Sequence, residues 1–96
     1  MQFEWDDDKA IRNQAIHGVS FEEAVEVFLD PYALEEFDEA HSEFEDRFRR
    51  LGISSKRLLL VVFTERNGDS IRIISTRKAT SREEEVYKYE RYQQGE

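Results

Sequence analysis

The tetrapeptide Arg-Asn-Gly-Asp at residues 66–69 constrains the fold of this chain more than any other feature. Asn-Gly tolerates the positive φ angles of a type I′ turn, the tight connection between two antiparallel strands. Residues 58–63 before it are apolar on both faces, which is typical of a central strand covered on both sides. Residues 70–77 after it are rich in isoleucine, which favours a strand that pairs back. The sequence therefore predicts an antiparallel hairpin.

A short strand and a helix are predicted at the start of the chain. Residues 1–5 alternate well enough for the strand. Aspartates at 6–8 then supply an N-cap and an acidic first turn for a helix that runs to about residue 16. Ile11 and Ala15 are four residues apart, so we expect them on the inner face of this helix. Gly18 is placed to end it.

Two capping boxes predict two further helices. Ser20 with Glu23 opens one helix and Thr80 with Glu83 opens the last one. The apolar residues in these helices follow helical spacing, namely Phe21, Ala24, Val25 and Phe28 in the former and Val86 and Tyr89 in the latter. Asp-Pro at 30–31 ends the former helix.

Two more strands complete the predicted sheet. Residues 32–37 fit an edge strand, and residues 47–54 form a mixed basic and apolar strand in which Gly52 marks a bulge or a close backbone approach. The order is strand, helix, helix, four strands and a final helix. It predicts a single α+β domain over residues 1–96. In this domain an antiparallel sheet of four to five strands packs against two N-terminal helices and a C-terminal helix.

Charge is distributed unevenly along the chain. The formal net charge is −8, and such an average would argue against a nucleic-acid partner. However, residues 1–46 carry 15 acidic and 2 basic side chains, whereas residues 47–82 carry 10 basic and 2 acidic ones. Residues 83–96 are acidic again. These faces could simply be solvated and pair with one another, or residues 47–82 could form a surface for a polyanion.

Composition and motifs exclude several classes of protein. The absence of cysteine excludes disulfides, thiol catalysis and thiolate zinc sites, and it fits the cytoplasm. No run of about 18 apolar residues is present, so we expect no membrane span. Met1 is followed by acidic and aromatic residues and not by a charged-then-apolar leader, so secretion is not expected. The chain contains no P-loop, Rossmann fingerprint or hydrolase elbow.

The two histidines are weak candidates when taken alone. His17 is predicted at the end of the first helix, where the helix dipole stabilises imidazolium, so it could exchange protons near neutral pH. It could equally serve as a helix cap. His41 lies in an acidic segment without the ligand spacing of a metal site, so we expect neither a metal nor a cofactor.

Basic residues in the segment 47–82 are stronger candidates, because guanidinium groups bind phosphate bidentately and neutralise charge that develops on it. Arg47 and Arg49 alternate onto one face of their predicted strand. Arg72 lies within an apolar strand, where arginine is costly unless it is paired or exposed in a groove. The candidates are Arg47, Arg49, Arg50, Lys56, Arg57, Arg72, Arg77 and Lys78. Ion pairing with the many carboxylates is the competing explanation.

Short motifs spread along nearly the whole chain provide a further indication. The N-terminal ones are Phe-Glu-Trp-Asp at 3–6, Lys9, Asn13 and His-Gly-Val-Ser-Phe-Glu-Glu-Ala at 17–24. The later ones are Asp38, His-Ser-Glu at 41–43, Glu45, Arg-Phe at 47–48, Gly52, residues 58–62, residues 71–77, Lys-Ala-Thr at 78–80, Glu83 and Tyr87. In content and order these motifs resemble the BrnT family of bacterial toxins.

The resemblance implies a RelE-like ribonuclease fold and a toxin of a type II toxin–antitoxin system that cleaves RNA and inhibits translation. It implies a BrnA-like antitoxin as partner, whose ribbon-helix-helix part binds operator DNA, so that DNA is bound only through the antitoxin. The basic segment and the lack of metal-ligand spacing suit metal-independent cleavage, in which the 2′-hydroxyl of the RNA attacks the adjacent phosphate.

Roles for individual residues follow as hypotheses. We expect His17 or Lys9 to transfer protons, with His17 ranked above Lys9. The residues expected to bind or stabilise the phosphate are Arg47, Arg72 and Arg77. Trp5 would offer a face on which a base can stack, although an aromatic residue here is more often part of the core. The residues expected to contact the rest of the RNA are Arg49, Arg50, Lys56, Arg57 and Lys78.

Two alternatives come from other classes of protein. The family usually has lysine where Ile16 stands, and arginines where Glu84 and Glu85 stand. These losses of positive charge motivate a binding module that keeps the toxin fold without nuclease activity and acts as a co-repressor. A metal-dependent hydrolase around His41 is disfavoured by the ligand spacing.

Overall fold

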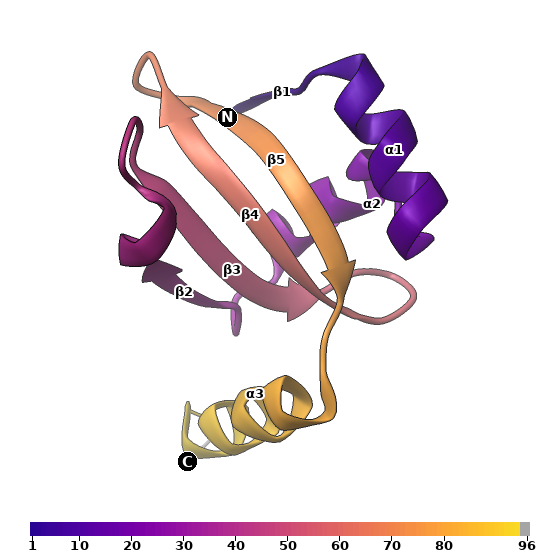
Figure 1. Cartoon of the computed structure of the whole chain (residues 1–96). Helices are drawn as coiled ribbons and strands as arrows, with labels where there is room; N and C mark the ends of the chain where they lie inside the picture. The colour runs from indigo at the N-terminus through magenta and orange to yellow at the C-terminus, as the bar shows by residue number, and fades with distance from the viewer. Residues whose placement is uncertain (95–96) are drawn as a thin grey trace.

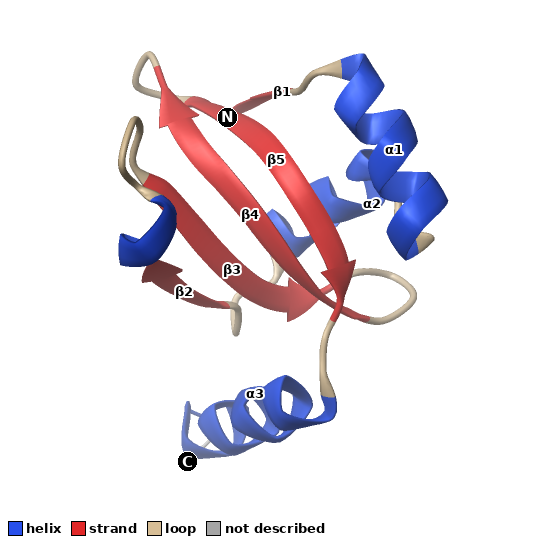
Figure 2. Ribbon diagram, viewed as in Figure 1, coloured by secondary structure: helices blue, strands red, loops and turns tan. Residues whose placement is uncertain are grey.

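A five-stranded sheet organises the protein, with helices packed against both of its faces (Figures 1 and 2). The computed structural model describes residues 1–94, so the last two residues of the predicted 1–96 domain lie outside the described residues. The elements are β1 Gln2–Glu4, α1 Asp7–His17, α2 Phe21–Glu26, β2 Leu34–Phe37, β3 Arg47–Ile53, β4 Leu58–Arg66, β5 Ser70–Lys78 and α3 Ser81–Gln94. Their order confirms the predicted α+β fold. None of the helices in this described part is long and apolar enough to cross a bilayer.

The strand order is β1-β5-β4-β3-β2, which places β2 at an edge as predicted. The pairs β2–β3, β3–β4 and β4–β5 are antiparallel, but β1 pairs with β5 in parallel. The prediction of a wholly antiparallel sheet is therefore wrong for β1. Hairpin turns fix direction only between strands that they join, and β1 and β5 are separated by most of the chain.

The turn between β4 and β5 and a glycine within β3 shape the centre of the sheet. Asn67 and Gly68 have φ angles of 48° and 79°, which confirms the predicted turn with two positive φ values between β4 and β5. Gly52 marks a close approach and not a bulge, because a Cβ there would lie 2.7 Å from Val27 Cγ1. The register shift in the sheet lies instead between Val62 and Phe63 of β4.

The main core lies between the sheet and the helices α1 and α2 (Figure 1). Phe21 and Ala24 of α2 are fully buried, which confirms the predicted inner face of that helix. They pack with alternate residues of β4 and β5, namely Leu59, Val61, Phe63, Ile71 and Ile73. The Ser20 hydroxyl accepts a hydrogen bond from the Glu23 N–H and caps the helix as predicted.

Helix α1 turns a polar residue, and not its apolar pair, toward the sheet. Ile11 is 68% exposed and Ala15 is exposed too, so the predicted inner face is wrong. Buried Asn13 donates through Nδ2 to the carbonyls of Thr76 (2.9 Å) and Val19 (3.1 Å), and its Oδ1 accepts from Thr76 N–H (3.1 Å). Because β1 pairs only with the first part of β5, Thr76 lies on an open strand edge. The Asn13 amide replaces the missing strand there.

Helix α3 is attached to the other face of the sheet by one buried residue. Tyr87 is only 4% exposed, whereas Val86 and Tyr89 are 46% and 63% exposed. The Tyr87 hydroxyl donates to Asp30 Oδ2 at 2.7 Å, and the ring packs with Leu51 and Leu60. The helix therefore covers one end of this face and leaves most of it free of helices (Figure 1). The expectation that residues 58–63 form a central strand covered on both sides is confirmed, because all six side chains are buried or partly buried.

Removing the Tyr87 hydroxyl should change the alkaline stability of the protein. Burial and the hydrogen bond to Asp30 raise the pKa of Tyr87 from 10.0 to about 12. A raised pKa means that the folded state favours the protonated phenol. Its contribution is complete below pH 10 and is lost as the pH rises toward 12. We expect Tyr87→Phe to lower the free energy of unfolding by about 2 kcal/mol at neutral pH. The difference in free energy of unfolding between the native protein and the variant, measured by urea unfolding, should narrow between pH 10 and 12. A difference that stays constant over this range would contradict the role given to the Tyr87 hydroxyl.

Candidate nucleic-acid interface

Four of the predicted basic residues lie on the face of the sheet that α3 leaves mostly open. Residues directly opposite one another in paired strands share a face. Arg47 and Arg72 both pair with Thr64 of β4, from its two sides, and Arg49 and Arg77 pair with Val62 and Leu60. Thr64, Val62 and Leu60 alternate along β4 and therefore point the same way. We call the surface formed by Arg47, Arg49, Arg72 and Arg77 the arginine face.

Each guanidinium of the arginine face contacts a carboxylate. The ion pairs are Arg77–Glu83 (2.8 Å), Arg72–Glu4 (3.1 Å), Arg47–Glu45 (3.7 Å) and Arg49–Glu36. The competing explanation, ion pairing, is therefore correct for the free protein. These pairs are partly exposed, so each is worth about 0–1 kcal/mol and an incoming phosphate can replace the carboxylate.

Arg77 has the best-formed of these pairs. Its Nη1 and Nη2 donate to the two oxygens of Glu83 at 2.8 and 3.0 Å, which is the bidentate geometry that guanidinium also uses with phosphate. Glu83 Oε1 also accepts from Thr80 N–H, and Thr80 Oγ1 accepts from Glu83 N–H, so the predicted capping box is present. The hydrogen bonds from Arg77 hold the pKa of Glu83 below its usual value. Glu83 is thus a charged group that fixes both α3 and Arg77.

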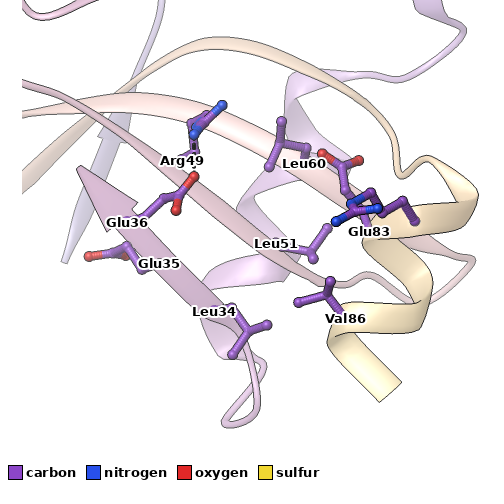
Figure 3. Close-up of a pocket in the computed structure, with 9 residues that line it drawn as sticks. Leu34, Glu35, Glu36, Arg49, Leu51, Leu60, Glu83 and Val86 are labelled. Atoms are coloured by element: carbon purple, nitrogen blue, oxygen red, sulfur yellow. Dashed lines mark hydrogen bonds and ion pairs between the residues drawn. The ribbon is translucent and has the colours of Figure 1, made fainter. Parts of the chain in front are cut away.

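A cavity of about 260 Å³ lies between the arginine face and α3 (Figure 3). Its floor is apolar and comes from Leu34, Leu51 and Leu60 on three adjacent strands. Val86 of α3 lies across from Leu51, and Arg49 and Glu36 stand side by side at the opposite wall (Figure 3). The remaining polar lining comes from Glu35, Arg82 and Glu83.

Two of the predicted RNA-binding arginines make hydrogen bonds within the fold. Arg50 lies over the Phe28 ring on the helix-covered side and donates to the carbonyls of Val27 and Asp30 at 3.3 Å. Arg57 donates to both oxygens of buried Glu23, at 2.8 and 3.0 Å, and to the Gly18 carbonyl. Arg50 also pairs with the exposed Glu35 at 3.0 Å. Charge alone does not distinguish Arg50 and Arg57 from surface arginines, so the sequence could not separate them.

The proton-transfer candidates do not share the arginine face. His17 and Lys9 are exposed on α1, which lies along the β5 edge of the sheet (Figure 1). No hydrogen bond or ion pair joins either residue to Arg72 or Arg77. Lys56 and Lys78 are exposed, in the β3–β4 loop and at the end of β5.

The remaining candidates have structural contacts. The Trp5 ring packs edge-on against Phe21 at 5.8 Å and lies partly buried against the main core. His41 Nδ1 contacts the carboxylate of buried Asp38 at 3.1 Å, in the turn before β3. Among residues 1–94, no cluster of three or more His, Asp and Glu side chains is arranged to hold a metal ion.

Three residues that matter at this site were missed by sequence reasoning. Glu36 and Glu4 neutralise arginines, and Val86 lines the cavity. Glu83 was identified only as a helix cap. The signal for Glu36 and Glu4 is cross-strand pairing, which places Glu36 opposite Arg49 and Glu4 opposite Arg72, and it becomes readable only when the strand register is known.

Comparisons with known proteins agree with the fold and the motifs. The family model described as ribonuclease toxin, BrnT, of type II toxin–antitoxin system matches residues 5–83, which include the whole arginine face. The crystal structure of the Brucella abortus ribonuclease toxin BrnT superposes with a TM-score of 0.65 and is 24% identical, covering 84% of this chain and 99% of that one. No curated protein sequence matches. This chain therefore belongs to the BrnT family of ribonuclease toxins of type II toxin–antitoxin systems.

Proposed function

We propose that this toxin cleaves RNA on the arginine face, without a metal ion, through attack by the 2′-hydroxyl of the RNA. The observation that supports this most is the convergence of four arginines from two strands that do not touch, β3 and β5, on one accessible face. Guanidinium groups that already sit in carboxylate pairs are preorganised for a phosphodiester, which offers the same oxygen geometry and gains negative charge as the 2′-oxygen attacks.

In the proposed reaction, the 2′-oxygen forms a bond to phosphorus and the bond to the 5′-oxygen breaks. The products are a 2′,3′-cyclic phosphate and a 5′-hydroxyl. The negative charge that grows on the phosphate oxygens is stabilised by Arg77 and Arg72. The 2′-hydroxyl must lose a proton and the leaving oxygen must gain one.

Glu83 is a better-placed proton acceptor than His17 or Lys9. When a phosphate binds Arg77, the Glu83 carboxylate loses its partner but stays beside the reacting group. Without the Arg77 hydrogen bonds that lower it, the pKa of Glu83 rises, which makes the carboxylate more basic. His17 and Lys9 could act only on RNA that passes around the β5 edge to α1.

The partner that we propose is a BrnA-like antitoxin with a ribbon-helix-helix part that binds operator DNA. An acidic or amphipathic antitoxin segment would replace Glu36 and Glu83 at the arginines and block RNA directly. RNA cleavage in the cytoplasm would then slow translation whenever the antitoxin is lost.

The experiment that tests this function incubates the purified protein with RNA in excess EDTA and analyses the new ends. We expect cleavage to persist and the 3′ fragments to begin with a 5′-hydroxyl, while the 5′ fragments end in a cyclic phosphate. Cleavage that stops with EDTA and returns with a divalent ion would contradict metal independence.

A second function is favoured by the complete pairing of the arginine face with carboxylates. A toxin-fold module without nuclease activity, acting as a co-repressor with its antitoxin, would tolerate such pairing permanently. Intact RNA in the assay above, together with normal growth when the protein is expressed without an antitoxin, would support this alternative.

A further inference from the structure

We propose that the cavity between α3 and the arginine face is a subsite for one RNA base, with guanine preferred. This rests on the proposed function, because the base would belong to the nucleotide whose phosphate is bound by the neighbouring arginines. The cavity of about 260 Å³ lies just below the usual range of about 300–1,000 Å³ for drug-sized ligands, which suits a single base.

The walls of the cavity suit the flat, apolar surface of a base. Leu51 and Leu60 form the floor, and Val86 of α3 faces Leu51 (Figure 3). A base in this slot would have apolar side chains against its ring, as flipped and single-stranded bases have in other proteins.

The cavity is continuous with the proposed phosphate site. Arg49, one of the four arginines, lines it directly. Arg77 lies in the same cross-strand row as Leu60 and Leu51, and its partner Glu83 also lines the cavity. A phosphate on Arg77 or Arg49 would therefore place the attached nucleoside at the mouth of the cavity. This continuity argues for a nucleotide and against an unrelated apolar ligand.

The Glu36 carboxylate at the cavity wall would recognise the hydrogen-bonding edge of the base. Glu36 is paired with Arg49 in the free protein, and its side chain is 64% exposed, so the pair can separate at little cost. When Arg49 turns to a phosphate, Glu36 is left as an acceptor with two oxygens. Guanine is the base that presents two adjacent N–H donors, N1–H and N2–H, to such a carboxylate. Uracil presents a single N–H donor between two carbonyl oxygens, and the carboxylate oxygens of Glu36 would repel these carbonyl oxygens.

The test compares Val86→Trp, which fills the slot from an exposed position, with Tyr89→Trp, which adds the same side chain to an exposed position of α3 outside the cavity. The probes are the four nucleoside 3′-monophosphates and inorganic phosphate, titrated by calorimetry or NMR. We expect guanosine 3′-monophosphate to bind about tenfold more tightly than inorganic phosphate. Val86→Trp should abolish this advantage and keep phosphate binding, and Tyr89→Trp should keep both.

The outcomes separate this subsite from the function on which it rests. Equal binding of all four nucleotides and inorganic phosphate by the native protein would overturn the base subsite, even if RNA is cleaved. A Val86→Trp variant that keeps the guanosine preference but no longer binds an antitoxin would also overturn it, and would assign the cavity to that partner. Guanosine preference in a protein that leaves RNA intact would support the subsite while the nuclease proposal fails.

Discussion

Arg77→Ala is expected to lower the rate of RNA cleavage by about 10²–10³-fold, the cost typical of removing one preorganised donor to a transition-state oxyanion. Arg77 provides two parallel N–H groups that point at Glu83 in the free protein and would point at the phosphate in the complex. Arg77→Lys keeps the charge but not the bidentate geometry, so it should recover only part of the activity. Single-turnover cleavage of a defined RNA gives the measurement.

Arg12→Ala is the matched control for Arg77→Ala. Arg12 is exposed on α1, which lies along the β5 edge of the sheet and carries none of the four arginines, so its loss removes the same charge without touching the arginine face. We expect a change of less than about twofold, because solvent and salt screen a charge at this distance. Circular dichroism is used to check that both variants are folded. Equal losses in the two variants would mean that net charge alone sets the rate.

Glu83→Gln separates the two roles that Glu83 would have. Glutamine keeps the capping box, since its amide oxygen can accept from Thr80 N–H, but it removes the charge that occupies Arg77. RNA should therefore bind more tightly, while cleavage of bound RNA slows by about 10²-fold or more because the proton acceptor is lost. Tighter binding with faster cleavage would show that Glu83 only shields Arg77.

Asn13→Leu is expected to destabilise the protein by about 3 kcal/mol, which corresponds to roughly 10 °C or more in the melting temperature of a domain of this size. Leucine fits the available volume but makes none of the three hydrogen bonds of Asn13. The N–H and carbonyl of Thr76 would be left buried without partners, and each orphaned group carries a desolvation cost. Thermal unfolding followed by circular dichroism measures the change.

Two further variants make the Asn13 result specific. Gln14→Ala changes an exposed neighbour on the same helix and should alter stability by less than about 0.5 kcal/mol. Asn13→Asp keeps an acceptor for Thr76 N–H but turns an oxygen toward the two carbonyls that Nδ2 now contacts. It should be at least as destabilising as leucine at neutral pH. A stable Asn13→Asp variant would show that the β5 edge does not need the amide.

Much of the fold could be predicted because its signals are local. Ser20 caps α2, Thr80 and Glu83 cap α3, and Asn67-Gly68 turns the hairpin, each through contacts within three residues. Predictions of which helix face is buried failed more often, because they depend on the element against which the helix packs. Ile11 and Ala15 have the spacing of an inner face, but α1 meets a strand edge whose polar groups require Asn13.

The candidate site was predicted only in part. The basic segment contains the arginine face, where the proposed site lies, but it also contains Arg50 and Arg57, whose guanidinium groups bind acceptors within the fold. No property of these two residues in the sequence differs from that of Arg49 or Arg72. They differ only in position: each arginine lies on one side of the sheet or in a loop. In a strand, a shift of one residue moves a side chain to the other side of the sheet.

The sequence by itself determined the elements, their order and the family, because caps, turns and strand alternation act between near neighbours and because the family motifs extend along the chain. Only the tertiary structure decided that β1 runs parallel to β5, that four arginines share one face with four carboxylates, and that α3 encloses a cavity beside them. These features join residues that are distant in sequence. Their pairing depends on strand register and helix docking, which are set by burial of the whole core and not by any local pattern.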